Sequence, residues 1–213
     1  MTENLHHCSE KQETGQAIMP RQLWDSRYAT FSPEYRLEPI PFVVSSLSNL
    51  AVEGWALDVA AGAGRHTLEL ARRGWLVDAV DISLQGLYLA QQRATRADLA
   101  SKINFVAADI ESPWLPCRHY SLILVSFFLH RPLFPLIKDR LLPGGWLIYE
   151  TFTLDRLNDA SRKNAPDRQP IRRELLLEYN ELRAIFSNFE ILFYDEGVHN
   201  GRATAQLLAR KPV

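Results

Sequence analysis

The stretch Leu57-Asp58-Val59-Ala60-Ala61-Gly62-Ala63-Gly64-Arg65-His66 decides the fold of this chain. It begins within an apolar run that starts at Trp55 and is typical of a buried strand, and a helical pattern of apolar residues follows it. Between them lies a turn of five Ala and Gly residues, whose small side chains allow a ligand to approach the backbone. The stretch therefore predicts a strand, a ligand-binding turn and a helix.

The same alternation of strand and helix continues along the chain. Strands are predicted over residues 75–80, 103–107, 120–127 and 146–151, and helices over 83–97, where Ser83 is a candidate cap, and 133–142. Residues 174–186 predict a further helix, and the runs 189–195 and 203–209, separated by a loop at 197–201, predict a terminal antiparallel hairpin. We expect an α/β fold with a doubly wound, mostly parallel seven-stranded sheet.

Length and composition favour one domain. The chain has 213 residues, of which 46% are hydrophobic, enough for one sizeable core. We expect a disordered leader over residues 1–19 and a single domain over 20–213, beginning with a helix at 20–28 and a second near Pro39. The 24 basic and 25 acidic residues nearly cancel, so a nucleic-acid partner is not expected.

The leader carries no secretory or membrane signal, and the chain has only two cysteines, Cys8 and Cys117. We therefore expect a cytoplasmic protein with no membrane association. His6, His7 and Cys8 are adjacent in the polar leader and rarely supply the geometry of a zinc site, so no metal is expected. The oligomeric state stays open.

Acidic residues follow three successive predicted strands. Asp58 ends the first strand, Asp81 follows the second 23 residues later, and Asp109 follows the third in Ala107-Ala108-Asp109-Ile110. A carboxylate after the second strand can accept hydrogen bonds from both hydroxyls of a ribose. Asp109 can accept from an exocyclic amine while Ile110 covers a purine face. Together these residues describe a site for adenosine.

These residues, with Leu141-Leu142-Pro143-Gly144-Gly145-Trp146-Leu147-Ile148, resemble the class I S-adenosylmethionine-dependent methyltransferases over residues 37–211. Within that superfamily the chain is most similar to the small tellurite-resistance and thiopurine enzymes. Three segments carry this closer resemblance: Trp24-Asp25-Ser26-Arg27-Tyr28, Val80-Asp81-Ile82-Ser83 and Ala205-Gln206-Leu207-Leu208-Ala209-Arg210-Lys211.

The resemblance implies S-adenosylmethionine as cofactor and a small-molecule methyl acceptor. It assigns the cofactor to Asp58, Ala60, Ala61, Gly62, Gly64, Asp81, Ile82, Asp109, Ile110 and Ser126. Asp58 and the turn would surround the methionine part, Asp81 the ribose, and Asp109 with Ile110 the adenine. Ser126 would face the methionine or the acceptor. Ala60 departs from the family pattern, which has glycine there, and we expect its methyl group to shift the turn without closing the site.

Other positions have two interpretations. Trp24, Arg27 and Tyr28 either pack on the sheet as an amphipathic helix or close over the acceptor and the sulfonium. His130 is a candidate catalytic base or the start of a helix. Tyr149 and Glu150 end the fifth strand and either contact the acceptor or point away from it. Residues 152–173 form a solvated loop or a basic lid.

Two functions rival a methyltransferase. A nicotinamide-dependent oxidoreductase shares the first strand, turn and helix, but Thr67 stands at the third position of its glycine fingerprint. A non-catalytic module that binds S-adenosylmethionine would carry the same residues. The acceptor is left open between a metalloid oxyanion, a thiol, a phenol and a carboxylate, and a macromolecular acceptor is the less favoured alternative.

Overall fold

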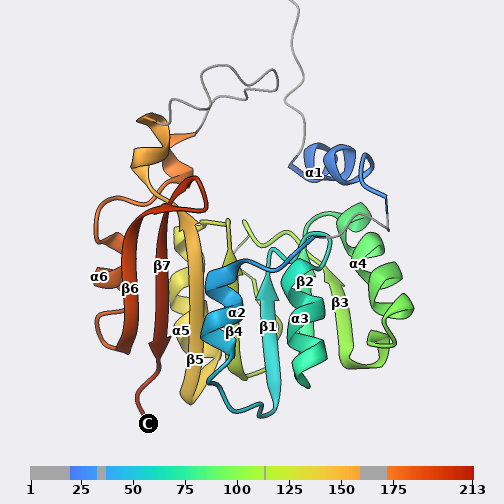
Figure 1. Cartoon of the computed structure of the whole chain (residues 1–213), viewed down its shortest axis with the longest axis horizontal. Helices are drawn as coiled ribbons and strands as arrows, with labels where there is room; N and C mark the ends of the chain where they lie inside the picture. The colour runs from blue at the N-terminus through green and yellow to red at the C-terminus, as the bar shows by residue number, and fades with distance from the viewer. Residues whose placement is uncertain (1–19, 33–36, 113, 159–171) are drawn as a thin grey trace, which may run out of the picture.

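A seven-stranded sheet with helices on both faces forms the body of the protein (Figure 1). The computed structural model describes residues 20–32, 37–112, 114–158 and 172–213. The expected leader lies outside these residues, as does most of the expected lid. The strands are β1 (Trp55–Val59), β2 (Leu76–Asp81), β3 (Ile103–Ala107), β4 (Tyr120–Ser126), β5 (Leu141–Phe152), β6 (Glu190–His199) and β7 (Arg202–Arg210).

The helices fill the connections between strands. The α-helices are α1 (Pro20–Tyr28), α2 (Pro41–Leu47), α3 (Arg65–Arg73), α4 (Leu84–Arg96), α5 (Phe134–Arg140) and α6 (Glu181–Ile185). Short 3₁₀ turns are η1 (Ala100–Lys102), η2 (Arg131–Leu133), η3 (Leu154–Asn158) and η5 (Arg173–Leu175). In the described residues no helix is long and apolar enough to cross a membrane.

The strand order is β3-β2-β1-β4-β5-β7-β6, with β7 antiparallel to both β5 and β6. The first five strands pair in parallel, and their register aligns the ends that matter for the site. Val59 of β1 is opposite Val80 of β2 and Val125 of β4, so these three strands end at one level. The predicted mostly parallel, doubly wound sheet with a terminal antiparallel pair is confirmed.

Alternate residues of the central strands fill two cores, one on each face of the sheet. Leu57, Val59 and Ile123 pack with the side chains of α5 and α6, including Phe134. Ala56, Leu122 and Leu124 pack with α2 and α3 on the other face. This alternation follows from the period of two along a strand, and it explains why the central strands are apolar throughout.

Two predicted elements differ from the structure. The single helix expected over 174–186 is replaced by η5 and the short α6, because Asn180 adopts a left-handed backbone with φ of 58° immediately before α6. The expected loop at 197–201 is mostly strand, since β6 runs to His199 and only Asn200 and Gly201 form the turn. Both have positive φ, which suits a two-residue hairpin turn.

Candidate functional site

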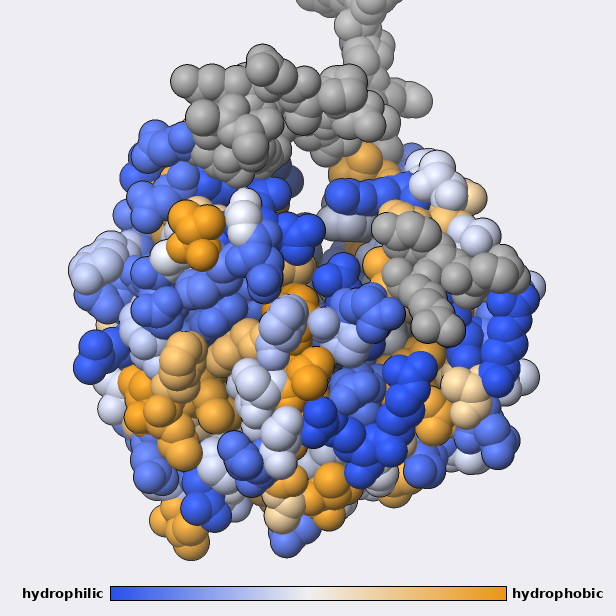
Figure 2. Space-filling view, viewed as in Figure 1, coloured by the Kyte–Doolittle hydropathy of each residue, from blue (hydrophilic) through white to orange (hydrophobic). Residues whose placement is uncertain are grey.

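A cavity of about 360 Å³ opens at the carboxyl ends of the parallel strands. Its volume lies in the range of roughly 300 to 1,000 Å³ of small-molecule sites. It collects residues from the turn after β1, the ends of β2 to β5, the start of β7, and α1. Figure 2 shows the molecule hollowed at this edge, between the side that carries α1 and the side that carries β6 and β7.

Asp81 lies at the centre of the predicted adenosine site. Its side chain lines the cavity, and its two carboxylate oxygens accept hydrogen bonds from the backbone N–H groups of Gly62, at 2.7 Å, and Ser83, at 2.8 Å. Each carboxylate oxygen can accept a second bond, so capacity remains for a diol. Burial raises the pKa of Asp81, although these two backbone bonds act against that shift. The two turns thus fix the carboxylate in place.

The neighbouring adenosine residues also reach the cavity. Ile82, Asp109 and Ile110 line it. Ile110 is 3% exposed and joins the core, whereas Asp109 is exposed and accepts a bond from the N–H of Glu111. Asp109 and two isoleucines therefore line the same cavity as Asp81.

The glycine-rich turn presents its alanines to the cavity. Ala60, Ala61 and Ala63 are among the lining residues, and Ala60 adopts a left-handed backbone with φ of 57°. That conformation costs a residue with a Cβ roughly 1 to 2 kcal/mol. Ala60 thus adopts a backbone conformation that glycine takes at lower cost.

Gly62 and Gly64 are not among the lining residues, but they allow neighbouring side chains to pack closely against the turn. A Cβ on Gly62 would lie 2.2 Å from Oη of Tyr28, so only glycine admits the Tyr28 ring against this turn. Gly64 precedes α3 and lies close to Ala90 of α4. Burial, with a further contribution from nearby Asp81, raises the pKa of Tyr28 to about 12. Tyr28 is therefore neutral near pH 7.

Helix α1 lies across the carboxyl ends of the strands (Figure 1) and is fixed to the start of α4. Asp25 accepts bonds from Oγ of Ser83, at 2.6 Å, and from the N–H of Gln85, at 3.0 Å. A carboxylate at the amino end of a helix is favourable there because of the unpaired N–H groups and the helix dipole. Trp24, Arg27 and Tyr28 of this helix line the cavity.

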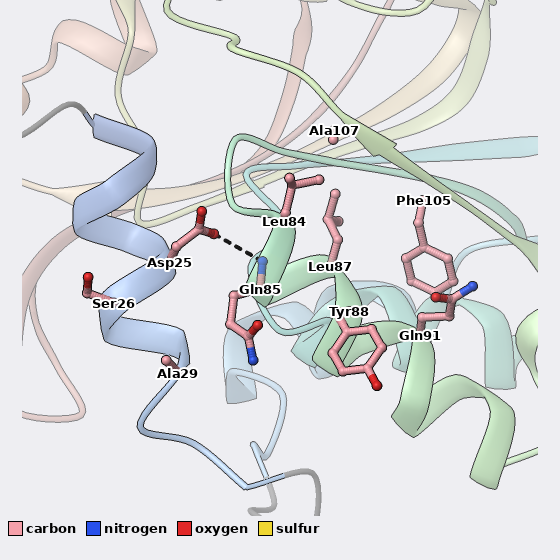
Figure 3. A pocket seen from close by; sticks show the side chains of 10 residues that line it. All are labelled: Asp25, Ser26, Ala29, Leu84, Gln85, Leu87, Tyr88, Gln91, Phe105 and Ala107. Carbon is pink, nitrogen blue, oxygen red and sulfur yellow. Dashed lines mark hydrogen bonds between the residues drawn. The ribbon is translucent and has the colours of Figure 1, made fainter.

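A second, larger hollow of about 790 Å³ lies between α1 and α4 (Figure 3). Ten residues line it: Asp25, Ser26, Ala29, Leu84, Gln85, Leu87, Tyr88, Gln91, Phe105 and Ala107. It contains none of the carboxylates that end the strands β1 and β2, and its one charged side chain, Asp25, already caps α4. Asp81, Asp109 and the alanines of the turn after β1 line the smaller cavity and not this groove.

Asp58 lies beneath the turn rather than in the cavity. It is 1% exposed, is not a lining residue, and accepts a 2.6 Å bond from Oγ1 of Thr67. Burial raises its pKa to about 7, against the opposing effect of the Thr67 bond. Its expected contact with the methionine part of a cofactor would therefore be indirect, through the turn that it supports.

His66 is a site residue that the sequence analysis passed over. It is 3% exposed and lines the cavity, where Nε2 accepts the N–H of Ile40 at 3.3 Å and Nδ1 lies 3.1 Å from Oγ of Ser126. Burial and nearby Arg65 lower the pKa of His66 to about 3, so the ring is neutral. Because Nε2 accepts, Nδ1 carries the proton and donates it to Ser126, whose own hydroxyl proton is left to point elsewhere.

The mouth of the cavity holds aromatic and basic side chains that no strand-end pattern predicted. Phe127 and Phe152 stack at 4.8 Å between ring centroids, and Phe31 and Phe128 line the same space. Four arginines line it as well: Arg27, Arg65, Arg156 and Arg202. Arg27, on α1, was a predicted site residue, whereas Arg65, Arg156 and Arg202 lie at the start of α3, in η3 and at the start of β7, where strand periodicity gives no signal.

Three predicted residues lie away from this cavity. Tyr149 is 1% exposed, packs on Phe134 and donates to the carbonyl of Phe128. Glu150 is 2% exposed and accepts a bond from Thr204, and His130 precedes η2 without lining the cavity. The expected substrate contacts of Tyr149 and Glu150, and the expected catalytic contact of His130, have no counterpart in this cavity, because Tyr149 and Glu150 are buried and none of the three lines it.

The fold and the site together define a class. A seven-stranded sheet with an antiparallel last pair, an acid at the end of β2 and a small-residue turn after β1 form a Rossmann-like arrangement with its ligand site at the carboxyl edge of the sheet. In the described residues no group of three or more His, Cys, Asp or Glu side chains could hold a metal ion.

Comparison with known proteins agrees with this class. Residues 56–145 match the model of a methyltransferase domain. The magnesium-protoporphyrin O-methyltransferase of Rhodobacter capsulatus is 37% identical over 75 residues, which cover 35% of this chain and 33% of that protein. The chain thus aligns with about a third of the length of this curated relative.

Solved structures show the same fold. TehB from Haemophilus influenzae superposes with a TM-score of 0.64 at 21% identity, over 79% of this chain and 61% of that one. An S-adenosylmethionine-dependent methyltransferase from Clostridium acetobutylicum has a TM-score of 0.63 at 16% identity, over 81% and 90%. Residues 56–145 thus match a methyltransferase domain, and the sheet has the fold of solved S-adenosylmethionine-dependent methyltransferases.

Proposed function

We propose that the protein transfers a methyl group from S-adenosylmethionine to a small-molecule acceptor in the cavity at the carboxyl edge of the sheet. One observation carries the proposal: Asp81, Asp109 and the alanines of the turn after β1 line a single cavity. The volume of that cavity, the remaining acceptor capacity of Asp81 and the apolar walls beside it all fit adenosine. One structural neighbour, the glycopeptide N-methyltransferase MtfA, is known in complex with S-adenosylmethionine, and its TM-score is 0.58 at 16% identity.

Each part of the cavity has a distinct task. Asp81 would accept the ribose hydroxyls, Asp109 an exocyclic amine, and Ile82 with Ile110 would cover the purine. Ser126 would donate its hydroxyl proton toward the methionine end, because His66 already supplies the bond that the serine oxygen accepts.

When bound, S-adenosylmethionine would supply an electrophilic methyl group on a cationic sulfur. The chain's own contribution is alignment and exclusion of water, since displacement at a methyl group needs a positioned nucleophile more than proton transfer. Tyr28 and Trp24, stacked at 6.0 Å between centroids, extend from α1 over this space and help to exclude water. A protonated Tyr28 can also offer its ring face to a cation.

The proposal includes a cytoplasmic location, supported by the chain having only two cysteines, and no nucleic-acid partner, supported by its nearly balanced charge. A non-catalytic binding module shares every contact named above. Calorimetric titration with S-adenosylhomocysteine, followed by a screen of small acceptors for release of that product, tests the proposal. Binding with turnover of at least one acceptor supports it, binding without any turnover favours the module, and binding of NADH in place of S-adenosylhomocysteine favours the oxidoreductase.

A further inference from the structure

Two of the arginines that line the cavity, Arg156 and Arg202, lie on the side opposite its acids. The acids Asp81, Asp109 and Glu111 follow β2 and β3, at one end of the sheet order. Arg156 follows β5 and Arg202 begins β7, at the opposite side of β1 and β4. One side of the cavity is therefore acidic and suits the hydroxyls and amine of adenosine, while the other side is basic.

The basic side is built around two phenyl rings. Phe127 and Phe152 stack with an angle of 10° between their planes. The guanidinium of Arg156 lies 3.5 Å from the ring centroid of Phe152, and that of Arg202 lies 5.1 Å from the centroid of Phe127. Arg65 lies 6.0 Å from the same Phe127 centroid. The rings thus hold guanidinium groups from three separate segments at one place.

Stacking on a ring face leaves the planar donor edge of the Arg202 guanidinium pointing away from the ring, and the geometry of that edge matches a carboxylate. In the described part of the chain, Arg202 makes no hydrogen bond or ion pair through its guanidinium. The stack also removes rotamer freedom from the arginine before a ligand arrives, which lowers the cost of binding. The arrangement is that of a prepared anion site.

The charge of the cofactor favours an anion from the acceptor as well. S-adenosylmethionine carries a sulfonium, an ammonium and one carboxylate, so its binding adds a net positive charge to the cavity. An acceptor that brings a carboxylate offsets that charge in a partly closed site, where charges interact more strongly than in water.

We propose that the methyl acceptor is an apolar, aromatic acid whose carboxylate binds at Arg156 and Arg202, beside the stacked Phe127 and Phe152. This inference rests on the proposed function, because it places the acceptor next to S-adenosylmethionine. The rings Phe31 and Phe128, also in the lining, supply apolar surface for the body of such an acceptor.

The test is a binding measurement on protein saturated with S-adenosylhomocysteine. The probes are cinnamate, indole-3-acetate and 4-hydroxyphenylacetate, each beside its primary amide. We expect at least one carboxylate to bind about tenfold or more tightly than its amide, and Arg202→Gln and Arg156→Gln each to reduce this preference at least threefold. Arg210→Gln is the matched control, because Arg210 stacks on Trp146 at 5.2 Å at the other end of β7. It should leave the preference unchanged.

The outcomes separate the two proposals. Failure of the wild-type protein to bind S-adenosylhomocysteine contradicts the proposed function itself. Normal binding of S-adenosylhomocysteine with no preference for any carboxylate, or with a preference that survives both substitutions, overturns only the acceptor inference. A third outcome also overturns it. If Arg202→Gln and Arg156→Gln weaken the binding of S-adenosylhomocysteine but not that of 5′-methylthioadenosine, which lacks the carboxylate, the two arginines bind the carboxylate of the cofactor.

Discussion

Replacing His66 with glutamine should remove a large part of the acid sensitivity of the fold. In the folded protein the pKa of His66 is lowered to about 3 from an ordinary 6.5, chiefly by burial. The unfolded chain therefore binds a proton between these values that the folded chain does not, so stability falls as pH falls through 6.5 toward 3. A protonated ring also cannot accept the N–H of Ile40.

The magnitude follows from linkage. Between pH 7 and pH 5 the unfolded His66 becomes almost fully protonated while the folded one stays neutral, which corresponds to a loss of about 2 kcal/mol in the free energy of unfolding. The assay is urea unfolding of wild type and His66→Gln at both pH values. The difference between pH 7 and pH 5 should be about 2 kcal/mol smaller in the variant, whatever its absolute stability.

Each protein gives a difference in unfolding free energy between pH 7 and pH 5. Subtracting the two differences cancels the contributions of the titrating groups that wild type and His66→Gln share. His119→Gln is the control for loss of a histidine as such, because His119 is exposed and lies outside the cavity lining. It should keep the wild-type difference between the two pH values. An equal pH dependence in wild type and His66→Gln would refute the buried, neutral imidazole and the Ser126 contact inferred from it.

Three further predictions concern the turn after β1. Burial raises the pKa of Asp58 to about 7, so its protonated form stabilises the fold, an effect that is complete below pH 4 and lost as pH rises through 7. Between pH 4 and pH 8 the unfolding free energy of Asp58→Asn, measured with urea, should therefore rise by up to about 4 kcal/mol relative to that of wild type. Parallel plots of unfolding free energy against pH for the two proteins would contradict this. Gly62→Ala should lower both the melting temperature and the affinity for S-adenosylhomocysteine, because its Cβ would meet Tyr28. Gly201 also has a positive φ, but the space around its Cβ position is open, so Gly201→Ala should lower stability by about 1 to 2 kcal/mol and leave that affinity unchanged. Ala60→Gly should relieve the left-handed strain and stabilise the protein by up to about 1 kcal/mol in thermal unfolding, with a destabilised variant as the contrary result.

The sheet and its ligand edge were predictable because they depend on local periodicity. Largely apolar runs mark β1 and β4, and Asp58 and Asp81 are the last acid of β1 and of β2, within one residue of the end of each strand. Parallel pairing then brings Asp81 and Asp109 to one edge without any knowledge of side-chain packing. The same reasoning located α1, and Ser83 as the cap of α4, whose hydroxyl accepts from Gly86.

Side-chain direction was the part that sequence could not supply. Asp58 and Tyr149 both lie near the end of a strand. Asp58 accepts a hydrogen bond from Thr67 beneath the turn, whereas Tyr149 packs on Phe134 in the core. His66 could not be recognised from the sequence because the second residue of a helix is commonly polar, and only the tertiary structure places Ser126 of β4 beside it. The arginine and phenylalanine stack brings together α3, β4, β5, η3 and β7, which only the tertiary structure joins.

Calorimetric titration of the wild-type protein and Asp81→Ala with S-adenosylhomocysteine tests the central claim most directly. The claim predicts saturable binding to wild type and an affinity lower by about 2 to 3 kcal/mol in a folded Asp81→Ala variant, since two ribose hydroxyls would lose a charged acceptor. Glu69→Ala is a suitable control, because Glu69 pairs with Arg73 on α3 and does not line the cavity. No heat from the wild type at high ligand concentration, or equal affinity in the folded Asp81→Ala variant, would contradict the account.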